Sequence, residues 1–175
     1  MTDDPHTRIR VLDTSSLLHL RYAFRRGEER DEALALLAEE VAAKHLFFPP
    51  QVKQEIEFGE REPRRVGVTI PPPSEYLQWI RDACSAGAER RPDDDIVSAT
   101  VKLVPQLVDI ASEREEADPY VLALAVELQA EGRPITVITD DIRDKGSLIS
   151  LASACGGLDI PSVRVAQLIA RLKRR

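Results

Sequence analysis

Carboxylates end two of the strands predicted in this chain. The segment VITDD runs from apolar and β-branched residues into Asp140 and Asp141, and the segment RIRVLD ends at Asp13. In open α/β sheets, functional sites lie outside the carboxyl ends of the strands. We therefore expect these three acids at one edge of a sheet.

Two further acids are expected to reach the same edge. Asp118 begins a helix predicted over ADPYVLALAVELQAEG, and Glu55 lies within a short helix predicted in PQVKQEIEFG. Each acid alone has a structural explanation, because strand-end acids suit turns, Asp118 before Pro119 suits an N-cap, and Glu55 suits a solvated surface. Only the joint placement of these acids favours a functional role.

A cluster of this kind points to metal chemistry. Several carboxylates packed together cannot all stay ionised unless cations neutralise them. Oxygen ligands without a matching set of histidines or cysteines select Mg²⁺ or Mn²⁺. Such ions activate water for in-line attack on a phosphodiester and stabilise the leaving oxygen. The predicted chemistry is the hydrolysis of nucleic acid.

The elements that must position these acids alternate between strand and helix. Each predicted strand is nearly continuously apolar, which is typical of a parallel sheet covered on both faces. We therefore predict an α/β fold, a three-layer α/β/α sandwich with a central, mainly parallel sheet. The predicted strands are 8–13, 46–48, 134–141 and 158–163, and the main predicted helices are 17–24, 28–45, 50–59, 75–86, 117–132, 147–157 and 165–175.

Residues 59–116 form an enlarged middle region. It begins with a polar, proline-rich loop, GEREPRRVGVTIPPPS, in which VGVTI is a short extended piece and Ser74 is expected to cap the next helix. A helical stretch after RRPDDD is interrupted at Pro105, which predicts two helices that meet at an angle. Because no linker divides the chain, we expect one domain over residues 1–175.

Composition excludes several classes of protein. The chain has 175 residues, 43% of them hydrophobic, and a formal net charge of −6. This charge argues against a generally basic nucleic-acid binder, although acids gathered around divalent cations would not repel a polyanion. The sequence shows no long apolar run and no secretory signal, so we expect a cytoplasmic protein without a membrane segment. Cys84 and Cys155 are expected to be reduced core residues.

Four short blocks occur in order along the chain: RVLDTSSLL, PPQVKQEI, ADPYVLALA and VITDDIRD. Together they resemble the four blocks of the PIN-domain nucleases, which include VapC-type toxins. LDIPSVRVAQLIARL is similar to the last strand and terminal helix of that family, so the resemblance spans residues 8–172. It implies a parallel sheet between helices and a carboxylate cluster that cleaves RNA with Mg²⁺ or Mn²⁺.

The resemblance also implies roles for individual residues. Asp13, Glu55 and Asp118 match the three acids that the family uses most consistently, for catalysis and for metal binding. The family pattern T-x-[DN] places Thr139 and Asp141 in the last block, which makes Asp141 the expected fourth acid.

Other residues are expected to assist. Ser15 and Thr139 would supply hydroxyls that orient the ligands or the attacking water. Asp140 occupies the variable place between Thr139 and Asp141, and which of the two acids faces the metal stays open. Asp144 follows closely enough to contribute.

Two departures from the family pattern bear on function. The region 59–116 is longer than in many compact toxins, which weakens a toxin assignment more than a nuclease assignment. The segment RDKG replaces an aromatic residue that often follows the fourth block. The resemblance implies an RNA substrate, a small antitoxin protein as partner and a homodimer. The alternative is a catalytically inactive PIN-like module that binds RNA or another protein.

Overall fold

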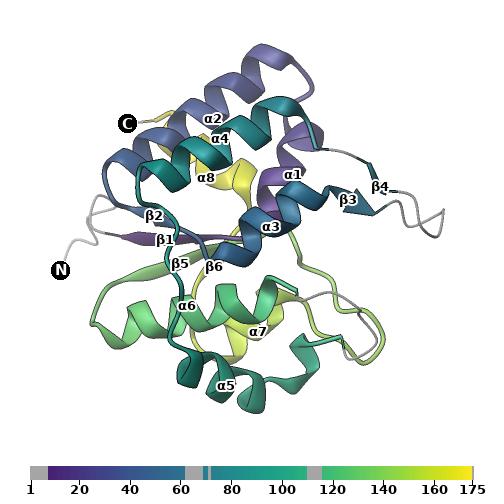
Figure 1. The fold of residues 1–175 in the computed structure, drawn as a ribbon, viewed down its shortest axis with the longest axis vertical. Helices are drawn as coiled ribbons and strands as arrows, with labels where there is room; N and C mark the ends of the chain where they lie inside the picture. Colours follow the sequence, from purple (N-terminus) through teal and green to yellow (C-terminus); the bar gives the residue numbers. More distant parts are fainter. Residues whose placement is uncertain (1–7, 62–68, 71, 110–115, 175) are drawn as a thin grey trace.

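The computed structural model describes residues 8–61, 69–70, 72–109 and 116–174. Helices and strands alternate along most of this part of the chain (Figure 1). The elements are β1 (Ile9–Leu12), α1 (Thr14–Ala23), α2 (Gly27–Ala42), β2 (Leu46–Phe47), α3 (Pro50–Phe58), β3 (Glu60–Arg61), β4 (Thr69–Ile70), α4 (Ser74–Ser85), α5 (Asp94–Leu103), the short 3₁₀ helix η1 (Pro105–Leu107), α6 (Asp118–Ala130), β5 (Ile135–Ile138), α7 (Leu151–Gly157), β6 (Ser162–Val163) and α8 (Val165–Leu172).

Four strands form one parallel sheet in the order β2-β1-β5-β6. The two central strands, β1 and β5, pair along their full length, with Val11 beside Val137 and Leu12 beside Ile138. Every residue of both strands is buried, as expected for strands covered on both faces. The predicted parallel sheet is therefore confirmed. A separate antiparallel pair, β3 and β4, lies outside this sheet.

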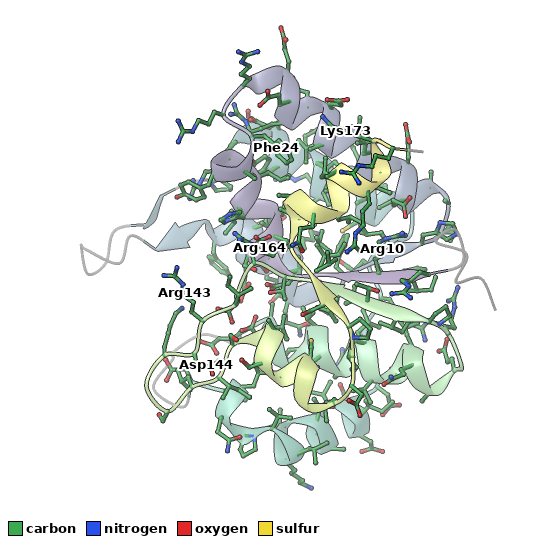
Figure 2. All side chains as sticks on the ribbon, turned by 180° about the vertical axis from the view of Figure 1, so that it is seen from behind. Arg10, Phe24, Arg143, Asp144, Arg164 and Lys173 are labelled. Carbon is green, nitrogen blue, oxygen red and sulfur yellow. The ribbon has the colours of Figure 1, made fainter. Side chains whose placement is uncertain are left out.

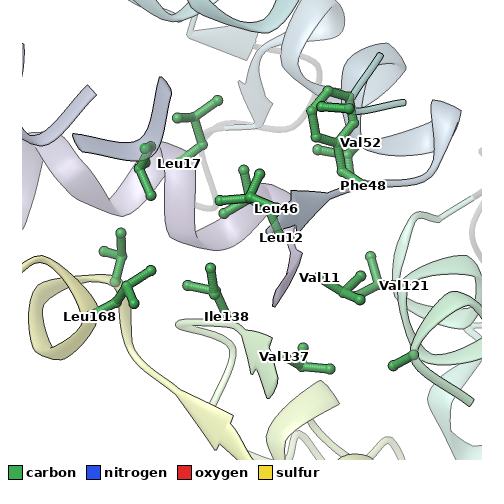
Figure 3. Close-up of a cluster of buried hydrophobic side chains, with 14 of the residues drawn as sticks. Val11, Leu12, Leu17, Leu46, Phe48, Val52, Val121, Val137, Ile138 and Leu168 are labelled. Atoms are coloured by element: carbon green, nitrogen blue, oxygen red, sulfur yellow. The ribbon is translucent and has the colours of Figure 1, made fainter. Parts of the chain in front are cut away.

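Helices cover both faces of the sheet, with α6 and α7 on one face and α1, α2 and α8 on the other (Figure 1). Alternate strand residues point to opposite faces. Val11 and Val137 thus lie on the side of Val121 from α6, whereas Leu12 and Ile138 lie on the side of α1 and α8 (Figure 3). This α/β arrangement is compatible with the predicted three layers.

Several helix boundaries differ from the predictions. Pro73 occupies the N-cap position of α4, so Ser74 is the first helical residue and not the predicted cap. A second helix was expected after Pro105; the described residues up to 109 contain only the single turn η1, which begins at Pro105. The helix expected from residue 147 begins at Leu151, because residues 145–148 form a tight turn before it. Of the extended piece predicted over 66–70, residues 69 and 70 form β4 and the others lie outside the described residues.

The structure also bears on the start of α6. Asp118 is its first residue and Pro119 follows, while Ala117 precedes the helix. The N-cap residue is Ala117, so neither it nor Asp118 supplies a local side-chain cap. The N-cap explanation for Asp118 is therefore wrong, and its carboxylate is available for another role.

Both cysteines are free, with Cys155 in the core and Cys84 only partly buried. Burial raises the pKa of the Cys155 thiol to about 12, so the thiol stays protonated at neutral pH. None of the helices in the described part of the chain has the length and apolar character that crossing a bilayer requires.

Candidate functional site

Asp13 follows β1 and is held rigidly at the carboxyl edge of the sheet. Its side chain is buried, and its Oδ2 accepts hydrogen bonds from the hydroxyls of Ser15 and Thr139, the latter at 2.9 Å. The pairing of Leu12 with Ile138 places Asp13 beside Thr139, and the Asp13 amide donates to the Ile138 carbonyl at 3.0 Å. The register of the two central strands therefore determines where this carboxylate lies.

The same two hydroxyls connect Asp13 with the chain that leaves β5. Ser15 Oγ accepts from the amides of Asp140 and Asp141 at 3.0 and 3.1 Å. Thr139 Oγ1 accepts from the Asp141 amide at 3.1 Å. Each hydroxyl thus donates to a carboxylate and accepts from the backbone, which fixes its orientation. Ser15 and Thr139 lie where the sequence analysis placed them, beside the acids.

Glu55 and Asp118 come together because α3 contacts the start of α6. Glu55 Oε1 accepts a hydrogen bond from the Ala117 amide at 2.8 Å, just before the first residue of α6. An amide at a helix start otherwise lacks a partner, so Glu55 supplies from another helix what a local cap usually provides. The Asp118 carboxylate is left to face the other acids.

Mutual repulsion and burial shift the ionisation of this cluster. Burial, with a smaller contribution from the charge of Glu55, raises the pKa of Asp13 to about 7, against the opposing effect of the hydrogen bond from Ser15. The pKa of Asp118 is raised well above its ordinary value, first by burial and then by the charges of Asp13 and Asp141. The acids therefore share one electrostatic environment in which full ionisation is unfavourable.

Glu55 and Thr14 add to this environment. Burial raises the pKa of Glu55, while the nearby Thr14 hydroxyl and the Ala117 amide act in the opposite direction. The Thr14 hydroxyl oxygen is itself buried and has no hydrogen-bond partner of ordinary geometry in the described part of the chain. Thr14 therefore lies beside Glu55, and its hydroxyl opposes part of the effect of burial on that carboxyl group.

The acids open onto a surface pocket of about 280 Å³. Glu55, Asp118 and Asp141 line it, whereas Asp13 lies buried behind it. Two further acids line the pocket, Asp109 and Glu116, and the Asp109 amide donates to Glu116 at 3.4 Å. The sequence analysis missed both. Glu116 stands two residues before Asp118, but no strand end or helix pattern marks either position as part of a site.

The two adjacent acids Asp140 and Asp141 have different surroundings. The Asp140 side chain is only 2% exposed and accepts from Arg164 Nε at 2.9 Å and from the Val165 amide at 3.1 Å, at the start of α8. Ser16 Oγ donates to it at 3.0 Å. Asp140 therefore joins β5 to α1 and α8, around the labelled Arg164 in Figure 2.

Asp141, in contrast, lines the acidic pocket. Its Oδ2 accepts from the Leu151 amide at 2.9 Å, at the first residue of α7. Its charge also raises the pKa of both Asp13 and Asp118. Of the two acids, Asp141 was the expected fourth acid, and it is the one that lies beside the cluster.

Asp144 lies outside the pocket, on the loop before α7 (Figure 2). Its Oδ1 accepts from the Ser150 amide and from Ser153 Oγ, both at 2.8 Å. These bonds lower the pKa of its exposed carboxyl group. As placed, Asp144 anchors the loop to α7 and does not touch the acids at the sheet edge.

The donor chemistry of the cluster suits a hard divalent cation, since Asp13, Glu55, Asp118 and Asp141 offer only carboxylate oxygens. The raised pKa values of the first three fit a set of groups that a cation would neutralise. As the side chains lie in the described residues, no group of three or more His, Cys, Asp or Glu is arranged to hold a metal ion. Ligand atoms are thus present but are not closed around a common point.

Comparison with protein-family models, with curated proteins and with solved structures found no significant match for this chain. The resemblance to PIN-domain nucleases therefore rests on the sequence blocks alone and stays a prediction.

Proposed function

We propose that this protein is a Mg²⁺- or Mn²⁺-dependent endoribonuclease of PIN-like fold, which hydrolyses RNA phosphodiester bonds. The observation that carries the proposal is the convergence of Asp13, Glu55, Asp118 and Asp141 from four separate segments on one sheet edge, where the pKa values of Asp13, Glu55 and Asp118 are raised. Holding these charges together opposes folding, so the arrangement makes sense when a cation neutralises them.

The four carboxylates would hold the ion or ions. Once bound, a divalent cation supplies a Lewis acid for the phosphodiester and for the attacking water. The residues around it have their own tasks. Ser15 and Thr139 keep Asp13 in one orientation through hydrogen bonds to Oδ2. Glu55, with its raised pKa, is suited to take a proton from the attacking water.

The resemblance to PIN-domain nucleases extends the proposal to partners and location. A small antitoxin protein would neutralise the enzyme by covering the acidic pocket. The enzyme would act as a homodimer in the cytoplasm. These parts rest on the sequence blocks and on no contact described above.

The substitution Asp13→Asn tests the enzymatic proposal. It should reduce Mg²⁺- or Mn²⁺-dependent cleavage of a labelled RNA by at least about 100-fold, because a ligand charge is lost while both hydroxyl bonds can be kept. Asp159→Asn is the matched control, since Asp159 is exposed and its φ of 55° is one that asparagine tolerates. Circular dichroism checks the fold, and cleavage by Asp13→Asn at the wild-type rate would sink the assignment.

A second candidate is a PIN-like module that binds RNA or a protein without catalysis. It is favoured by one observation, that the described acids are not arranged to hold a metal ion. Calorimetric titration with Mn²⁺ separates the two candidates. Binding of Mn²⁺ to the wild type that is lost in Asp118→Ala supports the enzyme, and the absence of binding in both proteins supports the module.

A further inference from the structure

Two cationic side chains stand among the acids of the pocket. Arg143 and Lys145 line the same opening as Asp118 and Asp141, and both are exposed. Within the described residues, neither forms an ion pair with an acidic side chain. Their charges are therefore available to an anionic ligand that enters the acidic pocket.

Asp144 lies between Arg143 and Lys145 in the sequence, but its side chain is bound elsewhere. Asp144 is bonded to Ser150 and Ser153 at the start of α7 and, as the structure describes these residues, forms no ion pair with either neighbour. Figure 2 shows Arg143 and Asp144 on this loop. On this loop, Asp144 is bound to α7, whereas Arg143 and Lys145 on either side of it line the pocket.

Backbone hydrogen bonds hold this loop in place. Lys145 and Leu148 exchange two of them, at 2.9 and 3.0 Å, around a turn in which Gly146 has a φ of 61°. The Ile149 amide donates to the Gln106 carbonyl of η1 at 3.1 Å. A backbone fixed at both ends presents its side chains with less loss of conformational freedom on binding.

A second, shallower groove of about 570 Å³ continues from the acidic pocket along η1. Asp109, Lys145 and Leu148 line both hollows, so Lys145 stands at their boundary. Pro105, Val108 and other residues of η1 and the turn form the remainder of the groove. A strand that places one phosphate at the acids would thus pass Lys145 before it leaves the surface.

We propose that Arg143 and Lys145 bind the phosphates that flank the scissile phosphate of an RNA strand, and that the groove along η1 receives the adjoining nucleotide. The inference rests on the proposed nuclease function and adds the residues that position its substrate. Arginine and lysine bind phosphates mainly through charge and release counterions when they do so. Their position also offsets the repulsion between the pocket acids and a polyanion.

The test compares two double variants that lose the same charge. Arg143→Gln/Lys145→Gln removes the proposed phosphate contacts. Arg25→Gln/Arg26→Gln is the control, because these arginines are also exposed but lie on the turn between α1 and α2, away from α7 (Figure 1). All variants are first compared with the wild type by thermal unfolding.

Binding is measured with labelled oligouridine and Mg²⁺ in an Asp13→Asn background, where cleavage is suppressed. Arg143→Gln/Lys145→Gln should weaken binding by about tenfold at low salt and reduce the slope of log Kd against log salt by about 1.4, for two lost phosphate contacts on a single strand. The Kd and the salt slope of Arg25→Gln/Arg26→Gln should stay close to those of the Asp13→Asn protein without further substitutions. Equal effects in the two double variants would overturn the inference.

Cleavage kinetics provide a second readout. A dinucleotide contains only the scissile phosphate, so Arg143→Gln/Lys145→Gln should lose more kcat/KM on oligouridine than on uridylyl-uridine. The same loss on both substrates would show that the cations do not bind flanking phosphates.

If the wild type cleaves no RNA but the binding loss is specific, the nuclease proposal fails and the phosphate contacts stand. If the wild type cleaves RNA and both double variants behave alike, the nuclease proposal stands and this inference fails.

Discussion

Asp13 shows how one carboxylate can be both anchored and electrostatically unfavourable. Two hydroxyl groups donate to it, which favours its charged form, yet burial and the neighbouring acids prevail and raise its pKa to about 7. The sequence predicted its position, because an acid directly after an apolar strand must lie at the sheet edge. The hydroxyl partners were expected as well, since Ser15 and Thr139 lie beside the acids in sequence.

This pKa predicts how the stability of the metal-free protein depends on pH. The folded state binds a proton at Asp13 up to about pH 7, whereas the unfolded chain releases it near the ordinary value of 3.8. The free energy of unfolding should therefore fall as pH rises between these values, by at most about 1.4 kcal/mol per pH unit for one proton.

Urea denaturation in EDTA between about pH 4 and pH 8, a range that runs from near the ordinary pKa of Asp13 to above its raised pKa, measures the effect. Asp13→Asn should flatten the dependence, and it should be more stable than the wild type at the upper end. A wild type that gains stability as pH rises through this range would contradict the raised pKa of Asp13.

The adjacent pair Asp140 and Asp141 marks a limit of sequence reasoning. Because the two side chains are identical neighbours, only the T-x-[DN] pattern of the resemblance favoured Asp141 over Asp140 as the fourth acid. The distinction comes from α8, since Asp140 is bound by Arg164, which is 24 residues further along the chain. Only the folded arrangement shows that Asp140 holds elements together while Asp141 lines the pocket.

Among the elements, α8 depends on Asp140 for its attachment to the sheet. Asp140→Ala removes the acceptor for Ser16, Arg164 and the Val165 amide, which should lower the free energy of unfolding by about 1–3 kcal/mol. Asp141→Asn should lower cleavage much more than it lowers stability. Urea denaturation and RNA cleavage, measured on both variants, test whether Asp140 has a structural role and Asp141 a role in cleavage. This assignment is wrong if Asp140→Ala keeps full stability and loses cleavage.

Helix boundaries near the site were harder to predict than the strands. The apolar run of β5 predicts a strand by itself. The start of α7 combines a local cap, in which Ser150 Oγ accepts from the Ser153 amide, with bonds to the preceding loop, since Asp141 accepts from Leu151 and Asp144 accepts from Ser150. At α6, in contrast, Glu55 bonds the Ala117 amide across 62 residues and replaces a local cap. Contacts of this kind do not appear in local sequence patterns.

For the whole molecule, the net charge of −6 does not show how acidic and basic side chains are distributed around the pocket. Acids gather behind and within one pocket, and the cations of the loop before α7 stand at the same opening. Composition alone could not predict this, and it could not add Asp109 and Glu116 to the site. Their placement depends on how η1 and the start of α6 meet.

Expression in a bacterial host tests the proposed enzyme as a complete molecule. Induction should arrest growth because cellular RNA is cleaved, and Asp118→Ala should relieve the arrest at equal protein levels. Growth curves with immunoblots measure both. Arrest that persists with Asp118→Ala would favour the non-catalytic module, which could act through binding alone.

The order of strands in the sheet has a consequence for when the acidic pocket can form. The central strands β1 and β5 are neighbours in space, yet the hydrogen bond from Thr139 to Asp13 joins residues that are 126 positions apart. Strands that are so far apart in the sequence pair slowly, because closing the long loop between them costs conformational entropy. While the ribosome is still making β5, the chain already contains Asp13, Glu55 and Asp118, but Thr139 and Asp141 have not yet been added. The acidic pocket therefore cannot assemble during synthesis until β5 and the residues up to Ser150 have been made.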